Sequence, residues 1–204
     1  MEHYYVIKLI LIGDQNVGKT TFFKKILNIV NEEDTSTIGV DYAVLFKKIK
    51  NNTLKIHLWD TAGQERFHSI IKNYFKNTTS AILFFDLNKE DTFESVEYWI
   101  KEYRNMNLCN HEHPIILIGN KNDLKINVNH ERIQEIVIKY NLIYQQMSIK
   151  NSEINCVFDS LIELIYNENI LKNLDCKGVK SIDNVEDKKI DLKNKNIKKI
   201  KCCI

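Results

Sequence analysis

Glycine is scarce in this sequence. It occurs six times in 204 residues, whereas an average usage of about 7% would give about 14. A chain so poor in glycine retains it where the backbone turns sharply or approaches another group closely. Gly178 falls in a lysine-rich stretch near the C-terminus, and we expect a sharp turn or a close approach at the other five, Gly13, Gly18, Gly39, Gly63 and Gly119.

The sequence also lacks a large net charge, a long apolar run and cysteine pairs at metal-binding spacing. The net charge of +2 gives no indication of nucleic-acid binding. The first apolar run, VIKLILI at residues 6–12, is too short to span a membrane and contains Lys8, so a buried strand is expected. The five cysteines are odd in number and lack metal-binding spacing, which favours a reduced, intracellular protein.

Apolar runs of strand length alternate along the chain with longer segments of helical periodicity. Only KNNT separates the second strand from the third, which predicts a hairpin. The other strands alternate with helices, which is typical of a mostly parallel α/β sheet covered on both faces. We expect strands at residues 6–12, 41–49, 54–59, 81–87, 114–119 and 142–147, and helices at 20–30, 67–75, 92–106, 130–140 and 153–171.

The pattern changes after the last predicted helix. Beyond about residue 172 the sequence is rich in Lys, Asn and Asp and has no aromatic residue, which is typical of a flexible segment. We therefore divide the chain into a domain at residues 1–171 and a tail at residues 172–204. The last helix of the domain has its apolar residues on one predicted face, at Ile154, Val157, Phe158, Leu161, Ile162, Leu164 and Ile165.

The first predicted strand leads into GDQNVGKT at residues 13–20, and a helix follows. This matches the phosphate-loop motif G-x-x-x-x-G-K-[ST] in the context that the motif requires. Backbone N–H groups and the helix N-terminus would meet the phosphate charge. Lys19 is expected to reach the β- and γ-phosphates and Thr20 to bind Mg²⁺. An ordinary strand–helix turn is the alternative, and the motif alone does not distinguish ATP from GTP or a kinase from a hydrolase.

A second motif, WDTAGQERF at residues 59–67, ends the third predicted strand. Asp60, beside the phosphate loop, suits a role in holding Mg²⁺. Gly63 can present its N–H to a γ-phosphate because it has no side chain, and Gln64 can orient an attacking water. A turn aspartate before a solvated helix is the alternative interpretation.

A third motif, GNKNDL at residues 119–124, follows the fifth predicted strand and indicates which base is bound. Guanine presents an N1–H and an N2–H₂ group on one edge, and the carboxylate of Asp123 can accept from both. Adenine offers a lone pair there, which would repel a carboxylate. The methylene stem of Lys121 can lie along the base plane, and Asn120 can brace the phosphate loop.

These three motifs, in this order and at these separations, resemble the small GTPases of the Ras superfamily, and STIGVDY (36–42) with WDTAGQERF resembles its Rab family. The resemblance covers roughly residues 5–170. It implies a P-loop NTPase fold with a six-stranded sheet and about five helices, GTP or GDP as the ligand, and Mg²⁺. The nucleotide-binding positions are then Asp14, Gln15, Asn16, Val17, Gly18, Lys19, Thr20, Thr21, Thr37, Gly63, Asn120, Lys121, Asp123, Ser148, Ile149 and Lys150.

The resemblance assigns further roles by position. Thr37 matches a threonine that binds Mg²⁺ and the γ-phosphate only in the GTP state, so the metal set is Thr20, Thr37 and Asp60, and the catalytic pair is Gln64 and Lys19. MSIK at residues 147–150 matches a motif whose backbone supports the guanine carbonyl. The implied effector surface comprises Ile38, Gly39, Val40, Asp41, Tyr42, Trp59 and Tyr74, although plain sheet packing is the alternative for its three aromatic residues.

Three positions depart from the family pattern. Gln15 replaces a glycine or serine near the γ-phosphate, and either crowds the attacking water or points away; we expect slow intrinsic hydrolysis. The stretch between Thr20 and Thr37 is slightly short and lacks an aromatic residue over the guanine, which would lower affinity or speed exchange. Ile149 replaces the usual alanine, and its role survives if the larger side chain has room.

The C-terminal sequence KKIKCCI places Cys202 and Cys203 one residue from the end. A metal pair would need further ligands, and a disulfide between neighbours is disfavoured in a reduced compartment. The C-a-a-X prenylation motif does not fit, because Lys201 holds the fourth position from the end. The Rab resemblance instead implies two geranylgeranyl groups, which anchor more firmly than one.

The resemblance implies a GTPase that regulates vesicle traffic as a monomer without nucleic acid. Its implied partners are an exchange factor, a GTPase-activating protein, effectors, a Rab escort protein and a GDP-dissociation inhibitor. Gln15 and LWDTAGQERFHSI resemble a Golgi-linked subgroup, so the expected location is the cytosolic face of a secretory, endocytic or Golgi membrane. The alternatives are a nucleotide-locked binding module and, more remotely, an ATP-dependent kinase.

Overall fold

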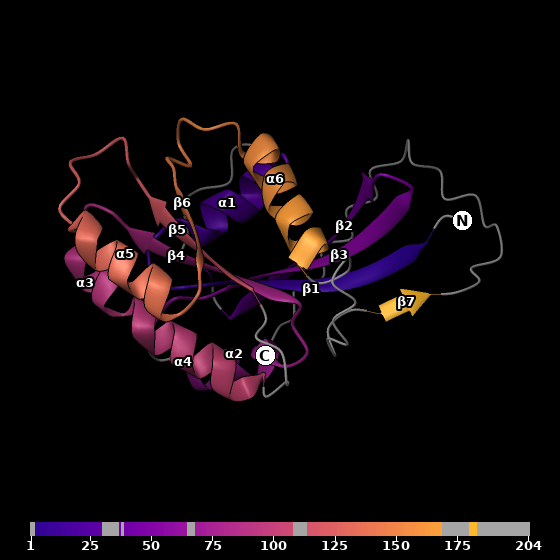
Figure 1. Cartoon of the computed structure of the whole chain (residues 1–204), viewed down its shortest axis with the longest axis horizontal. Helices are drawn as coiled ribbons and strands as arrows, with labels where there is room; N and C mark the ends of the chain where they lie inside the picture. Colours follow the sequence, from indigo (N-terminus) through magenta and orange to yellow (C-terminus); the bar gives the residue numbers. More distant parts are fainter. Residues whose placement is uncertain are drawn as a thin grey trace.

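The computed structural model describes residues 3–29, 37, 39–64, 68–107, 114–168 and 180–182. Strands and helices alternate along most of the chain (Figure 1). Their order is β1 (Tyr4–Ile12), α1 (Lys19–Ile26), β2 (Val40–Ile49), β3 (Asn52–Thr61), α2 (His68–Phe75), β4 (Ser80–Asp86), α3 (Glu90–Glu94), α4 (Val96–Met106), β5 (Ile115–Asn120), α5 (His130–Lys139), β6 (Ile143–Gln146), α6 (Ile154–Tyr166) and β7 (Lys180–Ile182).

The sheet has the strand order β2-β3-β1-β4-β5-β6. Among these six strands all neighbours run parallel except β2 and β3, which pair antiparallel. The predicted six strands, their mostly parallel arrangement and the hairpin at KNNT are therefore confirmed. Strands β4 and β5 are buried along their whole length, which explains why their sequences read as continuous apolar runs rather than as alternating patterns.

Helices cover both faces of the sheet (Figure 1). Helices α1 and α6 pack on one face, and α2, α3, α4 and α5 pack on the other. Successive residues of β1 contribute to opposite sides: Leu9 and Leu11 join the core under α1 and α6, while Ile10 and Ile12 join the core under the other helices. This two-residue alternation is the geometry of a strand buried on both faces.

Phe22 links the three elements of the first core. Its ring on α1 lies 5.2 Å, centroid to centroid, from Phe84 on β4 and 6.3 Å from Phe158 on α6, edge-on to both. The side chain is completely buried. Because α1 carries the residues that follow the first glycine-containing loop, this packing fixes where that loop lies.

Two predicted helices differ from those in the structure. The segment predicted at residues 92–106 begins earlier and divides at Ser95, whose hydroxyl donates to the Asp91 carbonyl and competes with the regular helix bonds. The α-helical part of α6 ends at Tyr166 and two π-helical residues follow, whereas the predicted end at residue 171 lies outside the described residues. Leu164 is 40% exposed, so its place on the predicted apolar face was wrong: it lies about 100° round the helix from buried Ile165.

Strand β7 was not predicted. It pairs antiparallel with Tyr4–Val6 of β1, beside the part of β1 that β4 does not reach. Its three residues lie within the segment that the sequence analysis assigns to the tail, and the boundary at residue 171 stays a prediction. No helix in the described ranges is both long and apolar enough to cross a membrane.

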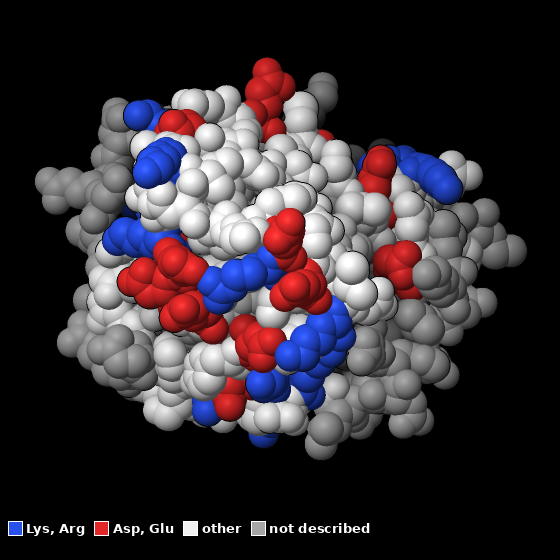
Figure 2. Space-filling model, turned by 60° about the vertical axis from the view of Figure 1, so that its left-hand side comes forward, with Lys and Arg blue, Asp and Glu red and all other residues white. Residues whose placement is uncertain are grey.

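Acidic and basic side chains are interspersed on the face shown in Figure 2. Ion pairs join the helices of the second layer: Arg132 on α5 with Glu90 on α3, and Lys139 on α5 with Glu97 on α4 at 2.8 Å. These pairs are largely exposed, so each contributes little to the free energy of unfolding. The apolar contacts beneath them carry most of the helix–sheet stability.

Replacing Phe22 by alanine tests the importance of the first core. We expect Phe22→Ala to lower the free energy of unfolding by about 3–5 kcal/mol, because it removes a buried ring and leaves a cavity. Denaturant unfolding measures this. Phe46→Ala is the matched control, since Phe46 is 46% exposed on β2 and should lose less than about 1 kcal/mol. Equal losses would show that this core does not set the stability.

Candidate functional site

A pocket of about 660 Å³ opens at the carboxyl ends of the sheet strands. Because parallel strands end at the same edge of a sheet, the loops that follow β1, β3, β5 and β6 meet there. The pocket is lined by Gln15, Asn16, Gly18, Lys19, Thr20, Thr21, Lys25, Thr37, Thr61, Gly63, Gln64, Asn120, Lys121, Asp123, Leu124, Ser148, Ile149 and Lys150.

The structure therefore brings together residues from all the sequence motifs. Of the predicted nucleotide-binding, catalytic and metal positions, only Asp14, Val17 and Asp60 are not in the pocket lining. Lys25, Thr61 and Leu124 also line the pocket and were not predicted. Thr61 and Leu124 adjoin recognised motif residues, whereas no motif indicated Lys25.

The phosphate-loop backbone is packed too closely to accept side chains at its glycines. Gly13 has φ +127°, and a Cβ there would lie 2.3 Å from the Phe84 carbonyl oxygen. Gly18 has φ +107°, and its Cβ would lie 2.4 Å from the Asn120 amide nitrogen. A Cβ on Gly63 would lie 2.3 Å from the Asp14 carbonyl. Three glycines predicted to mark close approach thus do so.

Lys19 is directed into the phosphate loop. Its ammonium donates to the carbonyls of Gly13 at 2.7 Å and Asp14 at 2.6 Å, and the side chain is 4% exposed. Burial lowers the pKa of Lys19 to about 8, partly opposed by the charges of Asp60 and Asp14. A desolvated ammonium held by two backbone carbonyls of the phosphate loop is well placed to bind an anion there.

Asp60 is completely buried behind two threonines of the pocket lining, Thr20 and Thr37. Its Oδ2 accepts from the Thr20 hydroxyl at 2.8 Å, and the Thr37 hydroxyl lies 3.4 Å from the same oxygen. Its Oδ1 is buried without a hydrogen-bond partner in the described part of the chain. Burial raises the pKa of Asp60 to about 6, partly opposed by Lys19 and Thr20.

This cluster fits a magnesium ion. Two hydroxyl oxygens and one carboxylate converge, with the Thr20 and Thr37 oxygens 2.5 Å apart. Mg²⁺ prefers oxygen ligands and is typically held by one or two protein groups together with phosphates and water. The unpartnered Oδ1 of Asp60 leaves a buried carboxylate oxygen that a cation could satisfy, because the nearby charge of Lys19 only partly offsets the effect of burial on the pKa.

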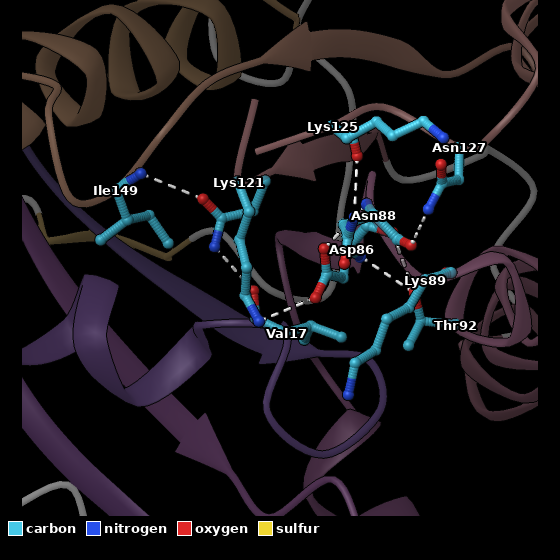
Figure 3. Close-up of polar contacts among 10 residues, drawn as sticks. Val17, Asp86, Asn88, Lys89, Thr92, Lys121, Lys125, Asn127 and Ile149 are labelled. Atoms are coloured by element: carbon cyan, nitrogen blue, oxygen red, sulfur yellow. Dashed lines mark hydrogen bonds and ion pairs between the residues drawn. The ribbon is translucent and has the colours of Figure 1, made fainter. Parts of the chain in front are cut away.

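The other end of the pocket is organised by Asn120, whose side chain bonds to Val17 and Ile149, both labelled in Figure 3. Its amide donates to the Val17 carbonyl at 2.8 Å, and its Oδ1 accepts from the Ile149 backbone N–H at 3.0 Å. Ile149 is buried, and its side chain lies over Gly18. The isoleucine side chain at position 149 therefore has room, because Gly18 has no side chain.

Lys121 and Asp123 project from the loop after β5. The Lys121 ammonium forms a 2.7 Å ion pair with Asp86, a residue that is 2% exposed and whose other oxygen accepts from the Asn88 N–H (Figure 3). Asp86 was not predicted, although an aspartate that ends a fully apolar strand was a usable signal. The pKa of the Asp123 carboxyl lies below its ordinary value, chiefly through the Ser148 hydroxyl.

Lys25 ties helix α1 to the loop after β6. Its ammonium donates to the carbonyls of Ile149 and Lys150, the latter at 3.1 Å. Together with Asn120, it holds residue 149 by both of its backbone polar groups. The phosphate loop, α1 and the loop at 148–150 are therefore mechanically joined.

The predicted aromatic trio forms one cluster outside the pocket. The Trp59 ring centroid lies 4.6 Å from that of Tyr42 and 5.3 Å from that of Tyr74. The Lys8 ammonium lies 5.2 Å from the Trp59 ring and donates to the Tyr74 carbonyl. Gly39, Val40 and Asp41 lie just before Tyr42, whereas Ile38, Cys202 and Cys203 lie outside the described residues.

Gly13→Ala tests the close approach at the phosphate loop. The substitution forces a Cβ onto the Phe84 carbonyl at a positive φ, so we expect the free energy of unfolding to fall by more than about 2 kcal/mol. Gly39→Ala is the control: it has φ +79° but nothing within 4 Å of its Cβ, and should lose about 1 kcal/mol. Urea unfolding in one nucleotide state compares them, and equal losses would contradict the steric account.

Comparison with known proteins agrees with this geometry. A family model described as "Ras family" matches residues 8–167. The chain is 31% identical over 211 residues to Ras-related protein RABA1b of Arabidopsis thaliana, covering 99% of this chain and 95% of that protein. It is 36% identical over 169 residues to Ras-related protein Rab-11A of Dictyostelium discoideum, covering 81% and 78%. It is 42% identical over 142 residues to Ras-related protein Rab-19 of Rattus norvegicus, covering 68% and 64%.

With most of its length matched in this way, the chain belongs to the Ras family and, within it, to the Rab small GTPases, which bind guanine nucleotides and hydrolyse GTP to GDP.

Proposed function

We propose that this protein is a GTP-hydrolysing switch that controls vesicle traffic at an intracellular membrane. The observation that carries the proposal is the convergence of three separate elements at one pocket: an anion-binding loop, two hydroxyls backed by a buried carboxylate, and an Asn-Lys-x-Asp base loop. Each alone has an ordinary structural explanation. Their common pocket has the size and polarity expected of a nucleotide site.

In this proposal the phosphates lie along the loop at residues 13–20. Its backbone N–H groups and the N-terminus of α1 meet their negative charge. The Lys19 ammonium exchanges the Gly13 and Asp14 carbonyls for β- and γ-phosphate oxygens. Since Lys19 is already buried and directed inward, little reorganisation accompanies that exchange.

Thr20, Thr37 and Asp60 would hold Mg²⁺. When bound, this ion neutralises developing charge on the phosphates. The Asp60 carboxylate, held by the Thr20 hydroxyl, fixes the position of the cluster. Thr37 is the member that lies outside the sheet and helices, so its contact with Asp60 is the one expected to depend on the bound nucleotide.

Hydrolysis in this site depends on positioning rather than on covalent chemistry. Gln64 is the residue proposed to orient the attacking water, and Gln15 also lines the pocket. The lining that the structure describes contains no arginine. A GTPase-activating partner would therefore supply the remaining charge stabilisation, and the unaided reaction should be slow.

The base is recognised at the opposite end. Asp123, ionised at neutral pH, would accept from the N1–H and N2–H₂ groups of guanine. Lys121 would cover the base plane with its methylene stem, held in place by Asp86. The Ile149 N–H, which donates to Asn120 in this structure, would be shared with the guanine carbonyl.

Single-turnover hydrolysis tests the proposed function. The protein should bind GTP in preference to ATP and hydrolyse it unaided more slowly than about 10⁻² s⁻¹. Gln64→Leu should slow GAP-stimulated hydrolysis at least about tenfold while leaving GTP binding intact, because it removes the group that positions water. Gln145→Leu is the control, because Gln145 is an exposed residue of β6 outside the pocket lining. Failure to bind GTP would refute the function, and binding without hydrolysis even with a GAP would identify a nucleotide-locked module.

The C-terminal cysteines would attach this switch to its membrane. Two lipid chains anchor firmly where one binds marginally. Lys195, Lys198, Lys199 and Lys201 would each add about 1 kcal/mol beside an anionic leaflet. The proposed tail at residues 172–204 then acts as a tether from the membrane to the domain at residues 1–171. An escort protein, a GDP-dissociation inhibitor, an exchange factor and effectors at the Tyr42–Trp59–Tyr74 surface complete the proposed cycle.

Replacing both C-terminal cysteines by serine tests the anchor. Cys202→Ser with Cys203→Ser should leave GDP and GTP affinity unchanged and move the protein from membranes to cytosol, measured by fractionation of cells expressing a tagged chain. Cys156→Ser is the control, since Cys156 is an exposed free cysteine on α6. Membrane association that persists in the double variant would refute the anchor without affecting the proposed GTPase activity.

A further inference from the structure

The phosphate loop has a polar contact with a helix outside the pocket. The indole Nε1 of Trp99 on α4 donates to the Asp14 Oδ1 at 2.7 Å. Trp99 is 2% exposed and Asp14 is partly buried, so the donor is removed from water, and a hydrogen bond to an ionised acceptor is stronger than one between neutral groups. Trp99 does not line the pocket.

Asp14 is in turn a junction of the site. Its backbone carbonyl accepts from the Lys19 ammonium at 2.6 Å. The same backbone packs against Gly63, where an added Cβ would lie 2.3 Å away. A displacement of Asp14 would therefore also move Lys19, which is proposed to bind phosphate, and Gly63, which precedes Gln64.

The Trp99 ring also contacts helix α2. His68, the first residue of α2, lies edge-on to Trp99 at 4.6 Å and stacks on Tyr98 at 5.4 Å. The Tyr98 hydroxyl and His68 Nδ1 are 3.1 Å apart. One indole thus contacts both the phosphate loop and the start of the helix that follows Gln64.

We propose that Trp99 is a positioning residue of the nucleotide site, which holds the phosphate loop in its binding geometry through the Asp14 carboxylate and couples that loop to α2 through His68. The inference rests on the proposed nucleotide site and adds a residue outside its pocket. Simple core packing accounts for the burial of the ring, but it does not account for a short hydrogen bond to a loop carboxylate.

Release of a fluorescent GDP analogue tests this role. Trp99→Phe removes the N–H donor and retains an aromatic ring, so we expect GDP release to become about tenfold faster, the scale of one hydrogen bond to a charged group. Tyr103→Phe is the matched control, because Tyr103 is equally buried on α4 and loses a contact with the Thr78 hydroxyl. It should destabilise the fold to a similar extent and leave GDP release unchanged.

A double-mutant cycle distinguishes positioning from packing. If Trp99 acts through Asp14, Trp99→Phe combined with Asp14→Ala should release GDP no faster than Asp14→Ala alone. In Asp14→Ala, which retains the indole, the Trp99 N–H should also lose hydrogen-exchange protection, a readout that is independent of whether Trp99→Phe folds.

Three results would overturn the inference. The first is additive effects of Trp99→Phe and Asp14→Ala on the rate of GDP release. The second is unchanged hydrogen-exchange protection of the Trp99 N–H in Asp14→Ala. The third is faster GDP release in Tyr103→Phe as well as in Trp99→Phe. In each of these the wild-type protein still binds GDP, so the proposed function stands. Failure of the wild-type protein itself to bind GDP would refute the proposed function and this inference together.

Discussion

The site depends on a steric constraint: the phosphate loop touches its neighbours backbone to backbone. At Gly13 it meets the Phe84 carbonyl of β4, and Gly63 meets the Asp14 carbonyl of the loop itself. No Cβ fits at either place. Because these approaches leave no slack, the loop is fixed relative to the central strands and to the segment that contains Gln64. A loop fixed in this way can present its N–H groups to phosphates with little free-energy cost for ordering the loop on binding.

Buried charge is the second organising element. Lys19, Asp60 and Asp86 are each less than 5% exposed, and ionised groups are costly to bury without partners. Asp86 has Lys121 as its ion-pair partner. Among the described residues, the Lys19 ammonium has only backbone carbonyls within hydrogen-bond distance, and Asp60 keeps one oxygen without a hydrogen-bond partner. The two groups whose charges are least satisfied are those proposed to meet the phosphates and Mg²⁺, and ligand binding would satisfy both.

Much of this arrangement was predictable because its determinants are local in sequence. GDQNVGKT, DTAGQ and NKND each follow a recognisable apolar strand, and parallel strands must bring their carboxyl ends together. Glycine scarcity correctly marked the tight contacts at Gly13, Gly18 and Gly63. The division of the helix at Ser95 and the exposure of Leu164 were not predicted, because both depend on small differences between competing local contacts.

The sequence alone determined where the strands occur along the chain, how the motifs are spaced and which chemical groups the pocket residues carry. These features follow from hydrophobic periodicity and from the side chains themselves. The tertiary structure decided which distant residues support them: Lys25 beneath Ile149, Asp86 behind Lys121, and Trp99 against Asp14. These partners are 124, 35 and 85 positions apart along the chain. No local pattern encodes such pairs, because they arise only when helices and strands pack and bring their side chains within hydrogen-bond distance.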